Sequence, residues 1–305
     1  MEDKTVDIIL ATYNGEKYLD EQIASLVNQT YRAIRILVTD DGSTDATSLV
    51  VQKWQQKDPR IFWCPNEQNK GYVKNFLDAV RRSESSYIML CDQDDIWNED
   101  KVFRTMQKMQ QLEDGEKPVM VFADAMNFDS TTGNDLGSFH KNSHLNTKKV
   151  DSAHLFMENK VIGCTVMVND PVKKYLQQLP DEIRVHDWWL ALICSHFGTI
   201  GYISEPLLRY RQHENNMIGG NRYGSYLKQR LLALREQREV LRATVRQAQA
   251  FYDCFSGEMT ELQKQMVKQF AGLYDVNWFL RRIRVIRHGF WKSGLGRNIG
   301  LLLLL

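Results

Sequence analysis

Short apolar runs rich in β-branched residues alternate with amphipathic segments through residues 6–97, and this alternation constrains the fold more than any other feature. We expect strands within 6–15, 34–45, 61–65 and 87–97. We expect helices within 16–29, 47–54 and 74–83. Strands and helices in this order predict βαβ units. We therefore expect an α/β fold with a mainly parallel sheet flanked by helices.

Polar side chains follow three of the expected strands. Thr12 and Asn14 follow the first strand, Asp40 ends the second, and Asp92 and Asp94 follow the strand that begins at Tyr87. In sheets of this kind, ligands bind outside the carboxyl ends of the strands. The pattern predicts one ligand site to which all three strand ends contribute.

The stretch "YIMLCDQDDIW" runs from a buried-type strand directly into Asp92, Asp94 and Asp95. Alternating carboxylates can converge on one hard cation, and Mg²⁺ or Mn²⁺ prefers oxygen ligands and leaves room for substrate phosphates. Such a metal would stabilise negative charge on a departing diphosphate. The alternative is a surface turn with helix-capping acids, and the motif alone leaves both interpretations open.

The pair Asp40-Asp41 also ends a strand. A carboxylate in this place can accept hydrogen bonds from a base N–H or a ribose hydroxyl. The alternative is an Asx-turn into the next helix, which Asp41 and Ser43 are suited to form. Asp40 is therefore the better ligand candidate of the pair.

The segment "VHDWWLAL" places His186 and Asp187 before a strongly apolar helix. One interpretation makes Asp187 a general base in a pocket walled by Trp188 and Trp189, with burial raising its pKa toward a useful value. The other makes it an acid that the dipole favours at a helix N-terminus.

The character of the chain changes after Gly219-Gly220, and we place a domain boundary near 220. Residues 1–220 would form the catalytic domain and residues 221–305 a basic helical region. A heptad-like seam of apolar residues runs from Leu227 to Phe255. This seam predicts a long helix that either packs within the chain or forms a homodimer.

The C-terminal region is basic. Residues 222–305 contain 15 Lys and Arg against 6 Asp and Glu, whereas the whole chain has a net charge of +1. The segment "NWFLRRIRVIRHGFWK" mixes aromatic, aliphatic and basic residues, a composition that suits an amphipathic helix on an anionic membrane. The alternative is a helix packed on the catalytic domain with a solvated basic face.

The cysteine pattern indicates a reducing compartment, and the N-terminal sequence gives no sign of secretion. The five cysteines are scattered and include no C-x-x-C pair, which supports neither a zinc site nor a disulfide framework. The N-terminus lacks the features of a signal peptide, and no apolar stretch is long enough to span a membrane. We expect a cytoplasmic protein, or one bound peripherally to the inner face of the plasma membrane. We expect no nucleic-acid partner.

Six motifs together carry a resemblance to a known family: "ATYNGEKYLDEQIASLVNQTY", "ILVTDDGSTDAT", "NKGYVKNF", "CDQDDIW", "HDWWLAL" and "RYRQHENN". In their order and spacing they resemble family 2 glycosyltransferases over roughly residues 5–220. The resemblance implies a Rossmann-like GT-A fold, a nucleotide-sugar donor, a divalent metal and inversion at the anomeric carbon. Within the family, the chain most resembles bacterial rhamnosyltransferases of cell-wall or surface polysaccharide synthesis.

The resemblance also implies roles for individual residues. It places Asp187 as the catalytic base and Asp94 as the metal ligand, with His213 completing the metal shell. Asp40 should meet the base, and Asp92 should lie nearer the ribose. The residues implied on the nucleotide side are Thr12, Asn14, Asp40, Asn69, Gly71, Lys74 and Asp92.

Two departures from the family pattern affect these roles. Many relatives have two acids where this chain has His186-Asp187, so His186 would reshape the acceptor side. The segment "NKGYVKNF" lacks the Ala-Arg-Asn of many members, which affects the details of the nucleotide contacts.

The resemblance favours transfer of rhamnose from dTDP-rhamnose to a saccharide or polyprenyl-linked acceptor. The alternative within the family is transfer from a UDP-hexose to a glycan or glycoprotein. Two alternatives of another class are a Mg²⁺-dependent nucleotidyltransferase and a non-catalytic nucleotide-sugar-binding module. The loop from Ala11 to Gly15 differs from the Gly-rich, basic loop usual in the former, and a binding module would not need Asp94 and Asp187 together.

Overall fold

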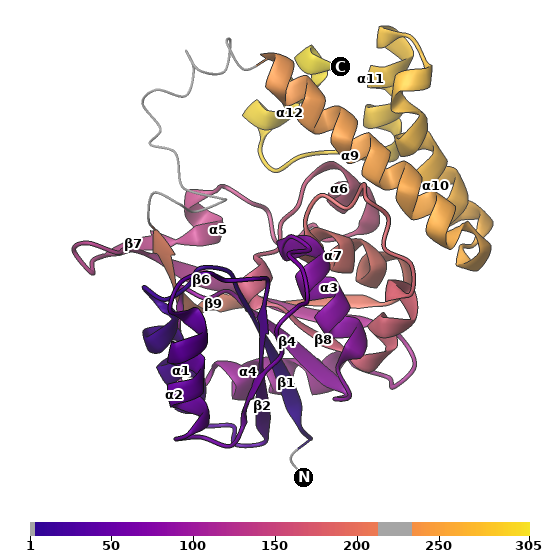
Figure 1. Ribbon diagram of the computed structural model, residues 1–305. Helices are drawn as coiled ribbons and strands as arrows, with labels where there is room; N and C mark the ends of the chain where they lie inside the picture. The colour runs from indigo at the N-terminus through magenta and orange to yellow at the C-terminus, as the bar shows by residue number, and fades with distance from the viewer. Residues whose placement is uncertain (1–3, 213–233) are drawn as a thin grey trace.

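The structure is a computed structural model that describes residues 4–212 and 234–305. The described residues form a nine-stranded sheet with helices on both faces (Figure 1). The strand order is β3-β2-β1-β4-β8-β6-β9-β5, and β7 pairs with β6. The strands are β1 (Val6–Thr12), β2 (Ile34–Asp40), β3 (Ile61–Trp63), β4 (Tyr87–Cys91), β5 (Ile96–Trp97), β6 (Val119–Asp129), β7 (Asp135–Ser138), β8 (Met167–Asn169) and β9 (Thr199–Gln212).

The strands β3, β2, β1 and β4 pair in parallel, which confirms the expected βαβ units. The next strand, β8, runs antiparallel to both β4 and β6, whereas β6 and β9 are parallel. The sheet is therefore mixed, and its continuous parallel block is the part that the alternating pattern predicts. Within this block Thr12 pairs with Asp40, and Leu10 pairs with Cys91. The three polar strand ends consequently meet at one edge of the sheet.

Helices connect the strands and extend the chain beyond the sheet. The α-helices are α1 (Leu19–Val27), α2 (Thr47–Gln55), α3 (Tyr72–Arg82), α4 (Lys101–Leu112), α5 (Phe139–Asn142), α6 (Ser152–Met157), α7 (His186–Phe197), α9 (Leu234–Phe255), α10 (Glu261–Ala271), α11 (Trp278–His288) and α12 (Leu295–Leu304). The 3₁₀ turns are η1 (Gly163–Thr165), η2 (Asp170–Leu176), η4 (Ser256–Glu258) and η5 (Gly272–Asp275).

Two hydrophobic cores lie on opposite faces of the sheet because successive side chains of a strand point to opposite faces. Ile8 and Leu10 of β1 join the core formed with α1, α2 and α4. Ile9 of the same strand joins the core formed with α3, α6 and α7. Strand β4 is buried along its whole length. Burial on both faces explains the uninterrupted apolar run that ends at the acidic stretch.

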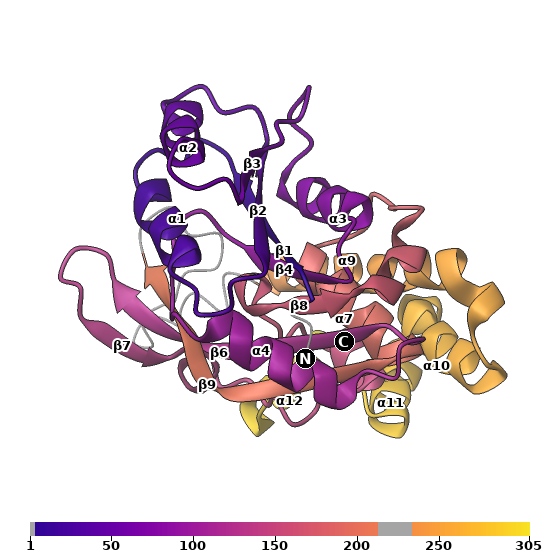
Figure 2. The ribbon, with the colours of Figure 1, turned by 90° about the horizontal axis from the view of Figure 1, so that it is seen from below.

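The C-terminal helices α9 to α12 contribute to the second of these cores. They lie beside α6 and α7, at the opposite end of the molecule from α1 and α2 (Figures 1 and 2). Leu241, Val245 and Ala248 of the predicted seam are buried in this core. The described part of the seam therefore packs within the chain.

Some expectations about the C-terminal region stay untested. The boundary near 220 and the start of the seam at Leu227 lie outside the described residues. A homodimer through these helices stays a prediction. No helix within 4–212 or 234–305 combines the length and the apolar character needed to cross a membrane.

Candidate functional site

The ends of β1 and β2 are joined by side-chain hydrogen bonds. The Thr12 hydroxyl donates to Asp40 Oδ1 over 2.9 Å, and both residues are buried. The backbone N–H groups of Gly42 and Ser43 donate to Asp40 Oδ2 over 3.2 and 2.9 Å. Asn14, with φ of 48°, accepts a hydrogen bond from Thr44 N–H at its Oδ1 over 2.9 Å. These contacts build a tight polar edge from three of the predicted nucleotide residues.

Asp40 and Asp41 have different structural roles from those the sequence suggests. The turn after β2 is closed by Asp40, whereas Asp41 reaches across to the loop before α3. The carboxylate of Asp41 accepts hydrogen bonds from the backbone N–H groups of Lys70 and Gly71, each over 2.8 Å. Asn69 Nδ2 donates to the Asp41 carbonyl over 2.8 Å. Asp41 thus orders the segment that contains Asn69 and Gly71, and the Asx-turn belongs to Asp40.

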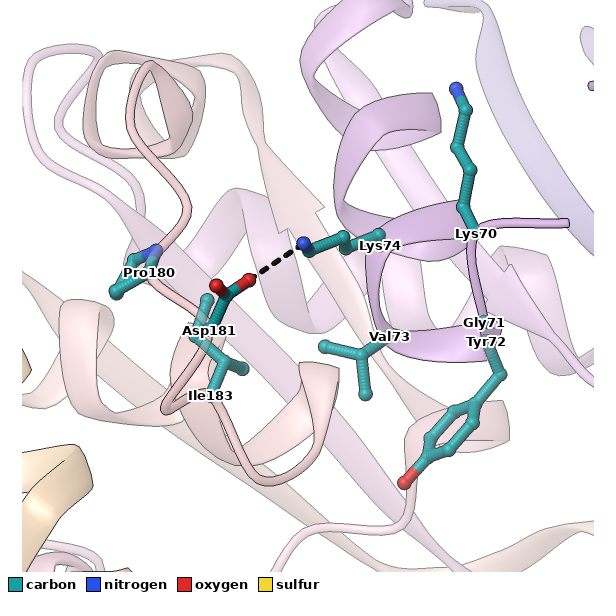
Figure 3. Close-up of a pocket in the computed structure, with 8 residues that line it drawn as sticks. All are labelled: Lys70, Gly71, Tyr72, Val73, Lys74, Pro180, Asp181 and Ile183. Carbon is teal, nitrogen blue, oxygen red and sulfur yellow. Dashed lines mark hydrogen bonds and ion pairs between the residues drawn. The ribbon is translucent and has the colours of Figure 1, made fainter. Parts of the chain in front are cut away.

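Lys74 lies in the first turn of α3, on the wall of a cavity of about 210 Å³. Its Nζ donates to Asp181 Oδ1 over 2.7 Å, across the space between α3 and the loop before α7 (Figure 3). The Lys70 side chain points away from this pair (Figure 3). Gly71, at φ of 77°, precedes α3 in a backbone conformation that side chains rarely adopt. Lys74 and Gly71 therefore border the same hollow.

The acids after β4 form the most charged part of the edge. One ligand atom each from Asp92, Asp95 and Cys164 lie within 4.8 Å of one another, a spacing that fits a single cation. Burial and the charges of Asp95, Asp94 and Asp187 raise the pKa of Asp92 well above its usual value. Burial also raises the pKa of Asp95 to about 7. Carboxylates crowded in this way favour a neighbouring cation.

The donor set fits a divalent metal in one further respect. Asp95 Oδ1 accepts a hydrogen bond from the Arg211 backbone N–H over 3.1 Å, but the buried Oδ2 of Asp95 has no hydrogen-bond partner. A buried carboxylate oxygen without a partner costs free energy unless a ligand satisfies it. Two carboxylates suit Mg²⁺ or Mn²⁺, whereas the Cys164 thiol is a softer donor.

Asp94 and His213 are the metal ligands that the resemblance implies. Asp94 follows Asp92 in the same loop, and its backbone carbonyl accepts a hydrogen bond from Arg211 Nε over 2.6 Å. Arg211 also pairs with Glu21 and stacks 4.5 Å from the Tyr18 ring. The strand β9 is thereby fixed against the acidic loop. His213 lies one residue beyond the first described range.

A buried lysine lies behind the acids. Lys101, at the start of α4, donates from Nζ to the Cys164 carbonyl and sits 3.2 Å from the centroid of the Trp97 ring. Burial lowers the pKa of Lys101 to about 8, while the nearby Asp95 and Asp92 oppose that shift. The lysine therefore provides fixed positive charge on the protein side of the carboxylates.

Asp187 stands at the start of α7 and is buried. Its Oδ2 accepts a hydrogen bond from Asn159 Nδ2 over 3.2 Å, and its Oδ1 accepts one from Trp188 N–H over 2.7 Å. Burial raises the pKa of Asp187 to about 6, against the lowering effect of these hydrogen bonds. The charge of Asp187 is also one cause of the raised pKa of Asp92, so both carboxylates belong to one electrostatic site.

His186 is the neighbour of Asp187 and has an unusual environment. Its ring stacks on Phe76 at 4.1 Å between centroids and meets Tyr72 edge-on at 6.0 Å. Neither ring nitrogen has a hydrogen-bond partner, and burial lowers the pKa of His186 to about 3. A Cβ on Gly163 would come 2.7 Å from His186 Nε2. The imidazole is therefore neutral, with unused hydrogen-bonding capacity, and depends on the glycine for its space.

One interpretation of the sequence has Trp188 and Trp189 both lining a pocket around Asp187. For Trp189 this interpretation is wrong. Trp189 turns into the core, where its ring lies 5.3 Å from Phe251 and 5.8 Å from Phe255 of α9. Trp188 is buried and donates from Nε1 to the Leu155 carbonyl. Adjacent helical residues point in directions about 100° apart, so both rings could not line the same pocket.

Three further residues near the acids and Asp187 were not found from the sequence. Cys164 and Asn159 come from the segment before β8, and Lys101 comes from α4. Only Lys101 offered a signal, because a lysine follows the acidic stretch closely in sequence. Cys164 and Asn159 reach the site through a chain reversal that no local pattern encodes.

Comparison with known structures identifies the class of this fold. The structure resembles those of GT-A glycosyltransferases: Staphylococcus aureus TarS (residues 1–349) in complex with UDP-GlcNAc gives a TM-score of 0.60 at 15% identity, covering 98% of this chain and 84% of that one. The mannosyltransferase PcManGT from Pyrobaculum calidifontis, in complex with GDP-Man and Mn²⁺, gives 0.56 at 14% identity, covering 99% and 79%. The fold is therefore GT-A, as expected.

The sequence matches Glycosyl transferase family 2 over residues 7–173, and the chain belongs to that family. A dTDP-rhamnosyl transferase, RfbG of Shigella flexneri, is 30% identical over 225 residues, covering 70% of this chain and 74% of the relative. The putative teichuronic acid biosynthesis glycosyltransferase TuaG of Bacillus subtilis is 27% identical over 221 residues, covering 72% and 82%.

Proposed function

We propose that this chain is an inverting glycosyltransferase in which Asp187 removes the proton from an acceptor hydroxyl. The hydroxyl oxygen then attacks the anomeric carbon of the donor, and the bond to the nucleoside diphosphate breaks. The observation that carries the proposal is the buried Asp187, whose pKa is raised to about 6, in one electrostatic site with the acids after β4. A carboxylate with such a pKa is a useful base near neutral pH.

The acids after β4 would hold the divalent metal, Mg²⁺ or Mn²⁺. We assign Asp94 and His213 as its ligands and Asp92 to the nucleotide side, with Asp95 close enough to share the ion. When bound, the metal would supply positive charge that stabilises the leaving diphosphate. The positive charge of Lys101 would offset part of the negative charge of the surrounding carboxylates and so reduce their repulsion of the donor diphosphate.

The nucleotide would lie along the edge formed by β1, β2 and the loop before α3. Asp40 would contact the base, and Thr12 and Asn14 would contact the nucleotide from the loop after β1. Asp41 would hold the backbone that presents Asn69 and Gly71. Lys74 would approach the donor by releasing Asp181, which is exposed and therefore weakly held. The ordered polar edge described above supports this assignment.

The donor we favour is dTDP-rhamnose, and the acceptor is a saccharide or a polyprenyl-linked sugar in bacterial cell-wall or surface polysaccharide synthesis. The name of the relative RfbG supports the donor, and that of TuaG supports a bacterial polysaccharide. A UDP-hexose donor is the second candidate, because TarS has been crystallised with UDP-GlcNAc. We propose that the protein works in the cytoplasm or at the inner face of the plasma membrane.

A panel of dTDP-, UDP- and GDP-sugars, incubated with the full chain and either metal, tests this proposal. We expect release of the nucleoside diphosphate from one nucleotide class, fastest with dTDP-rhamnose. With pyrophosphate added, formation of a nucleoside triphosphate and a sugar 1-phosphate would indicate a nucleotidyltransferase instead. Binding of a donor without turnover, with acceptors present, would indicate a binding module and contradict the proposal.

The space that Gly163 leaves for His186 gives a second prediction. Gly163→Ala is expected to lower kcat/KM for transfer by about 100-fold, because a displaced His186 would shift the adjacent Asp187, and a shift of about 1 Å in a reacting group costs that order of rate. The added Cβ would also lie 3.7 Å from the Asp187 Cβ, so it presses mainly on His186. Steady-state kinetics with saturating donor and varied acceptor measures the effect.

Gly257→Ala is the matched control, because a Cβ at Gly257 meets nothing within 4 Å. That variant should transfer sugar at the wild-type rate. Full activity of Gly163→Ala, with an unchanged melting temperature, would show that the position of His186 does not matter for the reaction.

A further inference from the structure

A basic cavity opens between α9, η5 and the helices α11 and α12, away from the acids and Asp187. Its volume is about 880 Å³. Five arginines line it together with aromatic and leucine side chains, and Asp275 is its acidic member. The arginines are Arg238, Arg242, Arg246, Arg281 and Arg282.

The positive charge of this cavity is only partly neutralised. Arg242 pairs with Glu239 over 2.6 Å. Arg238 and Arg246 make no ion pair with any residue in the described ranges. Arg281 donates to three backbone carbonyls, which fixes the direction of its guanidinium without cancelling its charge.

Three of the guanidiniums act on one tyrosine, Tyr274, which also lines the cavity. Burial raises the pKa of Tyr274, and the positive charges of Arg281, Arg242 and Arg238 oppose that rise. The centre of the Tyr274 ring is 4.4 Å from the Arg281 guanidinium carbon and 5.7 Å from that of Arg242. The cavity thus concentrates charge from two helices that are far apart in sequence.

The rim of the same cavity is apolar and faces solvent. Trp278 and Leu303 line the cavity and are 64% and 74% exposed. Phe279 and Ile283 continue the exposed surface along α11. On α12, Leu295, Ile299 and Leu303 recur every four residues and are all exposed. Two helices therefore present apolar stripes next to a group of arginines.

We propose that this cavity binds the phosphate headgroup of an anionic phospholipid while the exposed stripes of α11 and α12 enter the membrane interface. Guanidinium forks match phosphate oxygens, and tryptophan is favoured at the boundary between headgroups and acyl chains. A soluble anion would use the arginines but leave the apolar rim in water, whereas a lipid satisfies both. The charge complementarity selects an anionic membrane rather than a neutral one.

Vesicle flotation with the full chain and no donor tests the inference independently of sugar transfer. The wild type should float with vesicles of phosphatidylcholine and phosphatidylglycerol, but not with phosphatidylcholine alone. The combined variant Arg238→Gln, Arg242→Gln and Arg246→Gln should bind roughly 100-fold more weakly, since each basic side chain contributes roughly a fivefold factor at an anionic surface. Trp278→Ser with Leu303→Ser should also weaken flotation, which binding of phosphate alone would not require.

The control removes the same charge elsewhere: Arg32→Gln, between α1 and β2, with Lys53→Gln and Lys57→Gln, in and just after α2. All three side chains are exposed, and α1 and α2 lie at the opposite end of the molecule from the C-terminal helices (Figure 1). This variant should float like the wild type. An equal loss of vesicle binding in both triple variants would show that the effect comes from net charge alone, and it would contradict the cavity as the binding site. Absence of wild-type flotation, or equal binding to neutral vesicles, would overturn the inference altogether.

Discussion

Asp187→Asn is expected to lower the rate of sugar transfer by about 10²–10⁴-fold, the usual contribution of a general base. Asparagine keeps the shape of the side chain and its hydrogen bond to Trp188 N–H, so donor binding should be unchanged. Single-turnover transfer and equilibrium binding of the nucleoside diphosphate separate the two effects. Unimpaired transfer by this variant would remove Asp187 from the mechanism.

The pH profile of the wild type provides an independent measure of the same group. Asp187 must be ionised to accept a proton, and burial raises its pKa to about 6. The rate should therefore be on a plateau above this pH and fall about tenfold for each unit below it. Asp253→Asn, a change of an exposed acid on α9, should retain the wild-type profile. A profile that stays flat well below pH 6 would contradict the role of Asp187.

Removal of the divalent metal is expected to lower transfer by at least about 100-fold, because a metal supplies several kcal/mol of charge stabilisation. Activity should return with Mn²⁺ or Mg²⁺. Asp94→Ala should weaken binding of the nucleoside diphosphate in the presence of metal and leave weak metal-free binding unchanged. Calorimetric titration with and without a chelator measures both. Full wild-type activity in a chelator would exclude the metal role.

The same experiment distinguishes Asp94 from Asp95. The resemblance implies Asp94, whereas the atoms within 4.8 Å of one another belong to Asp92, Asp95 and Cys164. If Asp95→Ala loses metal-dependent binding and Asp94→Ala does not, the ligand assignment passes to Asp95. Asp100→Ala, in the exposed turn before α4, is the control and should bind as the wild type does.

Local pattern predicted much of the parallel half of the fold and several members of the candidate site. β4 was predictable because an uninterrupted apolar run needs burial on both faces, and its acids follow at the carboxyl end. The antiparallel direction of β8 was not predictable, since the sequence of a short strand does not encode parallel or antiparallel pairing. Cys164 reaches the acids only because of that pairing, so it had no signal of its own.

Other features depended on side-chain direction, which adjacent residues do not share. Asp40 and Asp41 are chemically identical neighbours, and only the path of the loop 66–71 decides which one closes the turn and which one holds the loop. Trp188 and Trp189 are separated in the same way by the turn of a helix. In both cases the sequence predicted that the pair of residues lies near the site, but not which groups each side chain contacts.

The contact of Trp189 with Phe251 and Phe255 joins the helical tail to α7, the helix whose first turn contains Asp187. A truncated chain that ended near residue 220 would leave the rear of α7 facing water, directly behind the proposed base. Cutting the chain there would consequently disturb chemistry as well as solubility. In chimeras made from two relatives, α7 and the C-terminal helices should therefore come from the same parent. A junction that keeps the chimera active would lie before His186 rather than at the boundary near residue 220 that composition suggests.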